Sequence, residues 1–170
     1  MSREVVAIDI DEVLFPFVPG FAALQNERYG TNLIVDDFFS YEFHQVLDLP
    51  VPETIDRVYD FVRADHGHIM PLPEAQTGLA RLSEKYDLSI VTARHPEFTD
   101  HTKAWLDRHF ADHFASLTFI GYAPIMEKPQ TKVSVCRDLG AIALIDDSLG
   151  HVSECAADGL PAVLEYFDAA

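Results

Sequence analysis

Two carboxylates at the end of an apolar run are the first candidates for chemistry in this sequence. Residues 5–14 read VVAIDIDEVL, so one residue separates Asp9 from Asp11. Side chains two residues apart on a strand face the same way, and burying an unpaired charge is costly. In open α/β sheets, ligands bind where the strands end. We therefore expect the pair to hold a cation, to work as an acid and a base, or to do both.

Polar residues also follow two later apolar runs and open one helical pattern. Thr92 ends the run in SIVTAR, where a hydroxyl followed by free backbone N–H groups can cradle a phosphate. Lys132 opens a predicted helix, whose N-terminus adds positive potential beside its ammonium. Asp146 and Asp147 end a further run; the alternative role for this pair is to cap the next helix.

The elements that must position these residues alternate between short apolar runs and helical patterns. Strands are expected over residues 5–10, 88–92, 117–120, 142–145 and 162–165, and helices over 73–86, 96–110, 131–139 and 149–157. This alternation predicts right-handed crossovers and an α/β fold with a mainly parallel five-stranded sheet flanked by helices. One sheet edge then collects three carboxylates, a hydroxyl and an ammonium, from Asp9, Asp11, Asp146, Thr92 and Lys132. This set suits a magnesium ion and a phosphate.

Residues 15–72 break the alternation, and we interpret them as a small helical cap inserted into a core of residues 1–14 and 73–170. Prolines punctuate the segment, and residues 21–29 and 53–64 have helical patterns. Ten of the 19 aromatic residues lie between positions 15 and 61. We therefore expect the insertion to have an apolar cluster of its own.

The composition excludes some partners. The net charge is −16, with 17 aspartates and four lysines. Such a surface repels phosphate backbones and anionic lipid, so neither a nucleic acid polymer nor a membrane is expected as a partner. A salt-rich cytoplasm is an alternative reason for the acidity. No signal or membrane-spanning pattern is present, and two cysteines without CxxC spacing are typical of a reducing compartment, which predicts a cytoplasmic location.

The order of the motifs resembles the haloacid dehalogenase-like (HAD) phosphohydrolase superfamily. The matching pieces are AIDIDEVL, SIVTAR, TKVSVCRDLG and ALIDDS, and the insertion stands where that superfamily places its C1 cap. The DIDEVLFPF opening, the short cap and the IDDS ending are most similar to the deoxyribonucleotidase branch (pyrimidine 5′-nucleotidase type). The resemblance implies a Rossmann-like core, a C1-type cap and a Mg²⁺-dependent phosphomonoester hydrolase with an aspartyl-phosphate intermediate. The implied substrate is a small phosphorylated metabolite such as a (deoxy)nucleoside 5′-monophosphate. Oligomeric state is not predicted.

The resemblance also implies catalytic and metal-binding roles. Asp9 would attack phosphorus, while Asp11 would protonate the leaving oxygen and then deprotonate water. Asp9, the backbone carbonyl of Asp11 and Asp146 would ligate Mg²⁺, which prefers oxygen ligands. Asp147 would orient a water molecule beside the ion.

The resemblance further implies how the phosphoryl oxygens are held. Thr92, the N–H of Ala93 and Lys132 would bind them as charge develops. Lys128 is the alternative lysine, but it precedes Pro129 in an expected loop. Lys132 is favoured because it begins the helix that leads into the Asp146 strand.

Contacts with the leaving group are expected from aromatic side chains in or next to the cap. The candidates for stacking on a base are Phe15, Phe17, Phe38, Phe39, Tyr41 and Phe43. The alternative is that most of them form the core of the cap. Arg94 follows the phosphate-binding turn, where it would contact the substrate or form a surface ion pair.

Other classes of protein fit the sequence less well. A dehalogenase needs neither Asp11 nor the pair Asp146 and Asp147. A signalling receiver carries its acidic pair on the first strand and its lysine last, whereas Lys132 here precedes the final aspartates. No GxGxxG follows the first strand, which argues against dinucleotide binding. A phosphatase of another small metabolite, or a catalytically silent phosphate-binding regulator, remains as the alternative.

Overall fold

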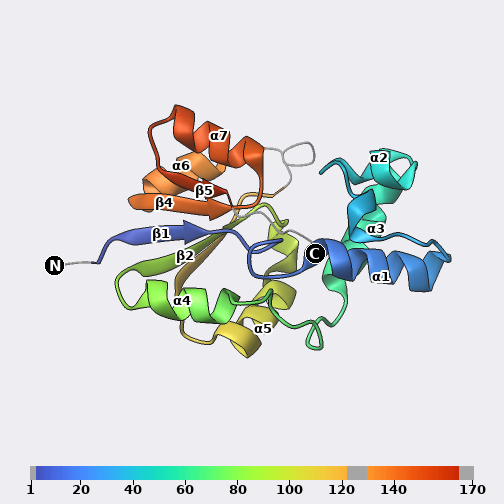
Figure 1. The fold of residues 1–170 in the computed structure, drawn as a ribbon, viewed down its shortest axis with the longest axis horizontal. Helices are drawn as coiled ribbons and strands as arrows, with labels where there is room; N and C mark the ends of the chain where they lie inside the picture. Colours follow the sequence, from blue (N-terminus) through green and yellow to red (C-terminus); the bar gives the residue numbers. More distant parts are fainter. Residues whose placement is uncertain (1–2, 122–129, 165–170) are drawn as a thin grey trace.

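Five parallel strands form the centre of the molecule (Figure 1). The computed structural model describes residues 3–121 and 130–164. The strands are β1 (Val5–Ile8), β2 (Asp87–Thr92), β3 (Phe114–Phe119), β4 (Ala141–Asp146) and β5 (Ala162–Leu164), in the order β3-β2-β1-β4-β5. Every neighbouring pair is parallel. The predicted α/β fold with a five-stranded sheet is confirmed.

Helices cover both faces of this sheet. Helices α4 (Ala75–Ser83) and α5 (Thr99–Phe110) lie on one side in Figure 1, and α6 (Lys132–Asp138) and α7 (Leu149–Ala157) on the other. A 3₁₀ turn, η2 (Pro96–Phe98), leads into α5. In the part of the chain that the structure describes, no helix has the length and apolar content needed to cross a bilayer.

The two faces of β1 belong to two separate hydrophobic clusters. Val6 and Ile8 lie in a cluster that includes Leu79 of α4 and Trp105 of α5. Ala7, between them, lies in the cluster with residues of α6 and α7. Side chains alternate along a strand, so a continuous apolar run is needed when both faces are covered. The apolar run before Asp9 is the sequence signature of this central, doubly covered strand.

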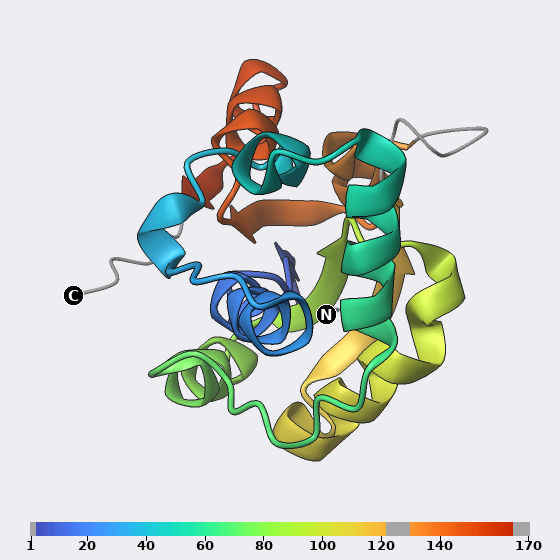
Figure 2. The same ribbon diagram turned by 90° about the vertical axis from the view of Figure 1, so that its right-hand side faces the viewer.

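The insertion (residues 15–72) forms four helical elements between β1 and α4. They are α1 (Phe17–Tyr29), η1 (Val35–Asp37), α2 (Phe43–Leu47) and α3 (Val51–Arg63), and they face the viewer in Figure 2. The sequence pattern predicted the two longer helices but neither η1 nor α2. The two ends of the insertion are held together, because the N–H of Leu72 donates to the carbonyl of Leu14 at 2.9 Å. The chain therefore leaves and re-enters the core at one place.

The expectation that the insertion has its own apolar cluster is wrong. Phe17, Phe21 and Phe61 belong to the same cluster as Ile8 of β1. Phe15 connects the two regions: its ring centroid lies 4.9 Å from that of Trp105 in α5 and 6.2 Å from that of Phe61. A segment of this size buries little surface alone, so sharing a core stabilises it more than a separate cluster would.

Helices α1 and α3 approach closely at Gly20. A Cβ atom there would stand 2.8 Å from Cζ of the buried Phe61. We expect Gly20→Ala to destabilise the protein by about 1–3 kcal/mol, because overpacking a buried contact forces neighbours off their preferred positions. Gly78→Ala is the matched control, since nothing lies within 4 Å of that Cβ position in α4. It should stabilise by about 0.5–1 kcal/mol. Urea unfolding measures both, and equal stabilisation would show that the α1–α3 contact is loose.

Candidate active site

Three carboxylates meet where β1 and β4 end. The N–H of Asp9 donates to the carbonyl of Ile145 at 2.9 Å, which places Asp9 beside Asp146. Asp9 and Asp146 are buried and Asp147 is partly buried. One carboxylate oxygen from each of the three lies within 4.8 Å of the others. The register of the parallel sheet therefore brings together residues more than 130 positions apart in sequence, as the motif spacing predicted.

Lys132 lies between two of these carboxylates. The hydroxyl of Thr131 accepts a hydrogen bond from the N–H of Ser134 and so caps the start of α6. The next residue is Lys132, whose Nζ lies 2.8 Å from Oδ1 of Asp9 and 2.6 Å from Oδ2 of Asp146. Burial opposes the charged form, but these two carboxylates raise the pKa of Lys132 to about 12. The ammonium therefore stays charged at neutral pH.

One ammonium does not balance three carboxylates. Burial raises the pKa of Asp9 to about 8, opposed by Lys132 and assisted by the charge of Asp146. Burial and the charge of Asp146 likewise raise the pKa of Asp147 to about 6. Burial is the largest cause of both shifts, and the neighbouring negative charge of Asp146 adds to it.

The donor set fits a magnesium ion. Oδ1 of Asp9 is buried and has no well-directed hydrogen bond from any residue that the structure describes, although it forms the ion pair with Lys132. A hard divalent cation prefers carboxylate oxygens and would supply the missing charge. Asp9, Asp146 and Asp147 are the residues whose oxygens lie close enough together to share it.

Thr92 and Ala93 lie at the end of β2, on the other side of β1. Thr92 is fully buried, and its hydroxyl oxygen accepts a hydrogen bond from the N–H of Arg94 at 3.2 Å. Ala93 lines a pocket that begins beside Asp11. The structure thus brings both residues to the sheet edge that carries Asp9. Lys128, the alternative to Lys132, lies outside the described residues.

Asp9 and Asp11 form ionic contacts with different partners in this structure. Strand β1 ends at Ile8, and the backbone then turns through Glu12, whose φ is 56°. Asp9 contacts Lys132, whereas Asp11 accepts hydrogen bonds from Arg94 at 2.6 and 3.0 Å. Alternation along a strand does not extend to Asp11, because it lies beyond the strand.

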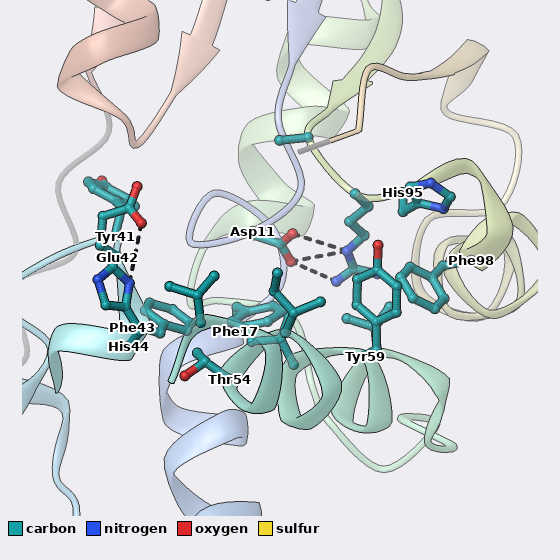
Figure 3. A pocket seen from close by; sticks show the side chains of 16 residues that line it. Asp11, Phe17, Tyr41, Glu42, Phe43, His44, Thr54, Tyr59, His95 and Phe98 are labelled. Atoms are coloured by element: carbon teal, nitrogen blue, oxygen red, sulfur yellow. Dashed lines mark hydrogen bonds and ion pairs between the residues drawn. The ribbon is translucent and has the colours of Figure 1, made fainter. Parts of the chain in front are cut away.

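A pocket of about 210 Å³ lies between the insertion and the core (Figure 3). Asp11, Ala93 and Arg94 line its core side. The insertion contributes an aromatic and aliphatic wall from Phe17, Tyr41, Phe43, Val51, Ile55, Val58, Tyr59 and Val62. The pocket thus begins at the expected acid and base residue and is mainly apolar beyond it.

The structure supports some of the expected substrate contacts and contradicts others. Phe17 and Phe43 line the pocket, but Phe38 packs against the hydrophobic cluster. Phe15 is 1% exposed within that cluster, so it cannot stack on a ligand. Phe39 is 74% exposed and is not part of the pocket wall. Aromatic composition predicted a wall of rings, but not which rings would be buried beneath it.

Tyr41 and Arg94 line the pocket but are already engaged with the core. The hydroxyl of Tyr41 donates to the backbone oxygen of Asp147 at 2.8 Å and lies 3.1 Å from its carboxylate. Arg94 is buried and bonded to Asp11, so the alternative of a surface ion pair is wrong. Tyr41 therefore connects the insertion to the acidic cluster, and Arg94 connects the pocket to Asp11.

Several residues of the pocket wall were not identified from the sequence as ligand contacts. Tyr59, His95 and Phe98 line the pocket, and the Tyr59 and Phe98 rings meet edge to face at 4.7 Å. His95 directly follows Arg94, and its place next to the end of β2 was the feature of the sequence that could have indicated a role in the pocket.

Glu12 accepts a hydrogen bond from the N–H of Val18 at 2.7 Å in the first turn of α1, which satisfies a donor that the helix leaves free.

Comparisons with known proteins agree with this geometry. Residues 3–127 match the family model described as 5′ nucleotidase, deoxy (pyrimidine), cytosolic type C protein. No curated protein sequence matches the chain significantly. Solved structures share the fold at low sequence identity, between 13% and 16% for the three described below.

Three of these structures show the extent of the likeness. A haloacid dehalogenase-like family hydrolase, SP0104 from Streptococcus pneumoniae, has a TM-score of 0.68 at 14% identity, covering 95% of this chain and 84% of that one. A HAD-superfamily hydrolase of subfamily IA from Geobacter sulfurreducens has 0.63 at 16% identity, covering 95% and 86%. YfnB from Bacillus subtilis, described as a HAD hydrolase and solved with magnesium bound, has 0.60 at 13% identity, covering 96% and 87%. The chain therefore belongs to the family described as 5′ nucleotidase, deoxy (pyrimidine), cytosolic type C protein, and it is a phosphatase of the HAD superfamily.

Proposed function

We propose that this protein is a Mg²⁺-dependent phosphomonoesterase that works through an aspartyl-phosphate on Asp9 and acts on (deoxy)nucleoside 5′-monophosphates. The observation that carries the proposal is the cluster of Asp9, Asp146 and Asp147 around Lys132, next to an aromatic pocket. In this proposal residues 1–14 and 73–170 are the catalytic core and residues 15–72 are the cap. The family name, with its cytosolic type, supports a cytoplasmic location.

Asp9 is the nucleophile in this mechanism. Its carboxylate oxygen forms a bond to phosphorus as the bond to the leaving oxygen breaks, which divides one difficult displacement into two. Asp9, Asp146 and the backbone carbonyl of Asp11 would hold Mg²⁺, with Asp147 beside them. The ion supplies positive charge that lets a phosphate dianion approach an acidic site.

The remaining core residues bind phosphate and move protons. An ammonium has three N–H donors. Among the described residues, Lys132 donates one hydrogen bond, to Asp146, and forms an ion pair with Asp9, so it has an N–H to offer a phosphoryl oxygen. Thr92 and the N–H of Ala93 would hold the other oxygens as charge develops. Asp11 would protonate the leaving oxygen in the first step and take a proton from water in the second.

The pocket supports a flat, uncharged leaving group. Tyr41, Tyr59 and Phe98 offer aromatic surface on which a base could stack. Among the described residues that line the pocket, Arg94 is the sole lysine or arginine, and Asp11 already neutralises it. In this part of the wall a second phosphate in the leaving group would therefore meet no unpaired lysine or arginine, which favours monophosphates over diphosphates.

A substrate screen with controlled metal tests the proposal. We expect hydrolysis of (deoxy)nucleoside 5′-monophosphates with Mg²⁺, loss of turnover with EDTA, and a kcat/KM for nucleotides at least about tenfold above that for sugar phosphates, since stacking on aromatic rings contributes about 1 kcal/mol or more. Equal rates for all esters would contradict the nucleotidase assignment and favour a phosphatase of another small metabolite. Phosphate binding without turnover would identify a silent regulator instead.

A further inference from the structure

The side chain of Arg94 forms an ion pair with both carboxylate oxygens of Asp11. Its Nη2 donates to Oδ1 of Asp11 at 2.6 Å, and its Nε lies 3.0 Å from Oδ2 and 3.2 Å from Oδ1 (dashed lines at Asp11 in Figure 3). The Arg94 side chain is 5% exposed, against 26% for that of Asp11. A guanidinium that engages both carboxylate oxygens fixes the plane of the carboxylate as well as its position.

Arg94 is itself held by two elements. Its Nη1 donates to the hydroxyl of Thr102, a fully buried residue of α5, at 3.1 Å. Its guanidinium carbon lies 4.9 Å from the ring centroid of Phe15. The backbone N–H of Arg94 donates a hydrogen bond to the hydroxyl oxygen of Thr92. Contacts within the core thus fix the orientation of the Arg94 side chain without a ligand. Because Arg94 binds both oxygens of Asp11, the orientation of that carboxylate is fixed as well.

We infer that Arg94 is a positioning residue that acts through Asp11 rather than a contact for the substrate. The inference rests on the proposed aspartyl-phosphate mechanism. In the second step, the oxygen of a water molecule forms a bond to phosphorus while the bond from phosphorus to the Asp9 oxygen breaks. The Asp11 carboxylate takes the proton of that water, inorganic phosphate leaves, and Asp9 is restored. Arg94 holds the Asp11 carboxylate at the pocket edge, in a fixed orientation, for this proton transfer.

The arrangement makes different demands on the two steps. In the first step Asp11 delivers a proton to the leaving oxygen, so one of its oxygens must turn away from the guanidinium. A p-nitrophenolate leaving group needs almost no protonation, so p-nitrophenyl phosphate makes only the second step depend on Asp11. This substrate therefore isolates the step that Arg94 is inferred to support.

A double-mutant cycle on Asp11→Asn and Arg94→Gln tests the inference. With p-nitrophenyl phosphate and saturating Mg²⁺, we expect Arg94→Gln to lower kcat about tenfold in the native background and less than twofold in the Asp11→Asn background, because residues that act as a unit are not additive. The phosphorylated enzyme should accumulate in Arg94→Gln, as measured by rapid acid quench. Arg94→Lys keeps the positive charge but cannot engage both carboxylate oxygens of Asp11 as the guanidinium does. Its kcat should therefore lie between that of Arg94→Gln and that of the native enzyme. Arg81→Gln, an exposed arginine on α4, is the matched control.

Three outcomes would overturn the inference. A higher KM with unchanged kcat would make Arg94 a substrate contact. An equal fall in kcat in both backgrounds would mean that Arg94 acts independently of Asp11. If the native enzyme shows no hydrolysis, the proposed function fails. Urea unfolding of the native protein, the two single variants and the double variant then still tests the contact between Arg94 and Asp11. Additive effects of the two substitutions on the unfolding midpoint would overturn the inference, and a clear coupling between them would support it.

Discussion

Asp9→Asn should abolish turnover while leaving the protein folded. The substitution removes the proposed oxygen nucleophile, and losing a nucleophile costs on the order of 10⁴-fold or more in kcat. The fold should survive because asparagine has the same shape and removes a buried carboxylate whose pKa is raised to about 8. Turnover of a phosphate monoester with Mg²⁺ measures the loss, and near-ultraviolet circular dichroism measures the fold.

Protein phosphorylation distinguishes a nucleophile from a metal ligand. Native enzyme quenched in acid during turnover of ³²P-labelled substrate should carry label, and Asp9→Asn should carry none. Asp107→Asn is the matched control, because Asp107 is exposed on α5 and far in sequence from the acidic cluster. A labelled, fully active Asp9→Asn protein would show that another residue attacks phosphorus.

Lys132→Met should have the largest effect on stability. The ammonium lies within 2.8 Å of Asp9 and 2.6 Å of Asp146, and all three residues are buried. Removing one partner of a buried ionic network leaves uncompensated charge and costs about 3–5 kcal/mol. Urea unfolding in EDTA should show this loss, and Mg²⁺ should restore part of it because the ion neutralises the same carboxylates.

The same variant should also lose turnover, which decides between the two candidate lysines. Without Lys132 the phosphoryl oxygens lose a charged donor, so kcat should fall by about 10²–10³. Lys103→Met, on the exposed side of α5, should change stability by less than about 0.5 kcal/mol. Lys128→Ala should keep native turnover. Loss of activity in Lys128→Ala with full activity in Lys132→Met would reverse the assignment.

The order of elements was predictable because it depends on local patterns. Short apolar runs alternate with helical patterns, and right-handed crossovers then make the strands parallel. The order of the strands across the sheet was not predicted and comes from the structure. The positions of Asp9, Thr92 and Asp146 follow from the same rule, since parallel strands end at one edge. Element boundaries shifted by a few residues, as at β1, which stops at Ile8 and releases Asp11 from the alternation of the strand.

The sequence indicated an inserted segment, but it did not predict how the side chains of that segment pack. Prolines and aromatic residues indicated a separate segment, yet the burial of each ring depends on neighbours far away in sequence. Phe15 is buried because Trp105 of α5 and Phe61 of α3 both lie against it. Phe39 carries the same side chain and is exposed. Hydrophobicity predicts that most rings are buried, but only three-dimensional packing selects which ones line a pocket.

The sequence by itself determined the types of group at this edge of the sheet, because Thr92 and Asp146 end strands, Asp9 directly follows one and Lys132 opens a helix. The tertiary structure alone decided how these groups are paired. Asp9 is joined to Lys132 by the packing of α6, and Asp11 to Arg94 by the turn after β1. Ionic contacts depend on distances of a few ångströms between side chains that no local rule specifies. The two aspartates that stand together in the sequence therefore serve two separate ionic contacts in the folded protein.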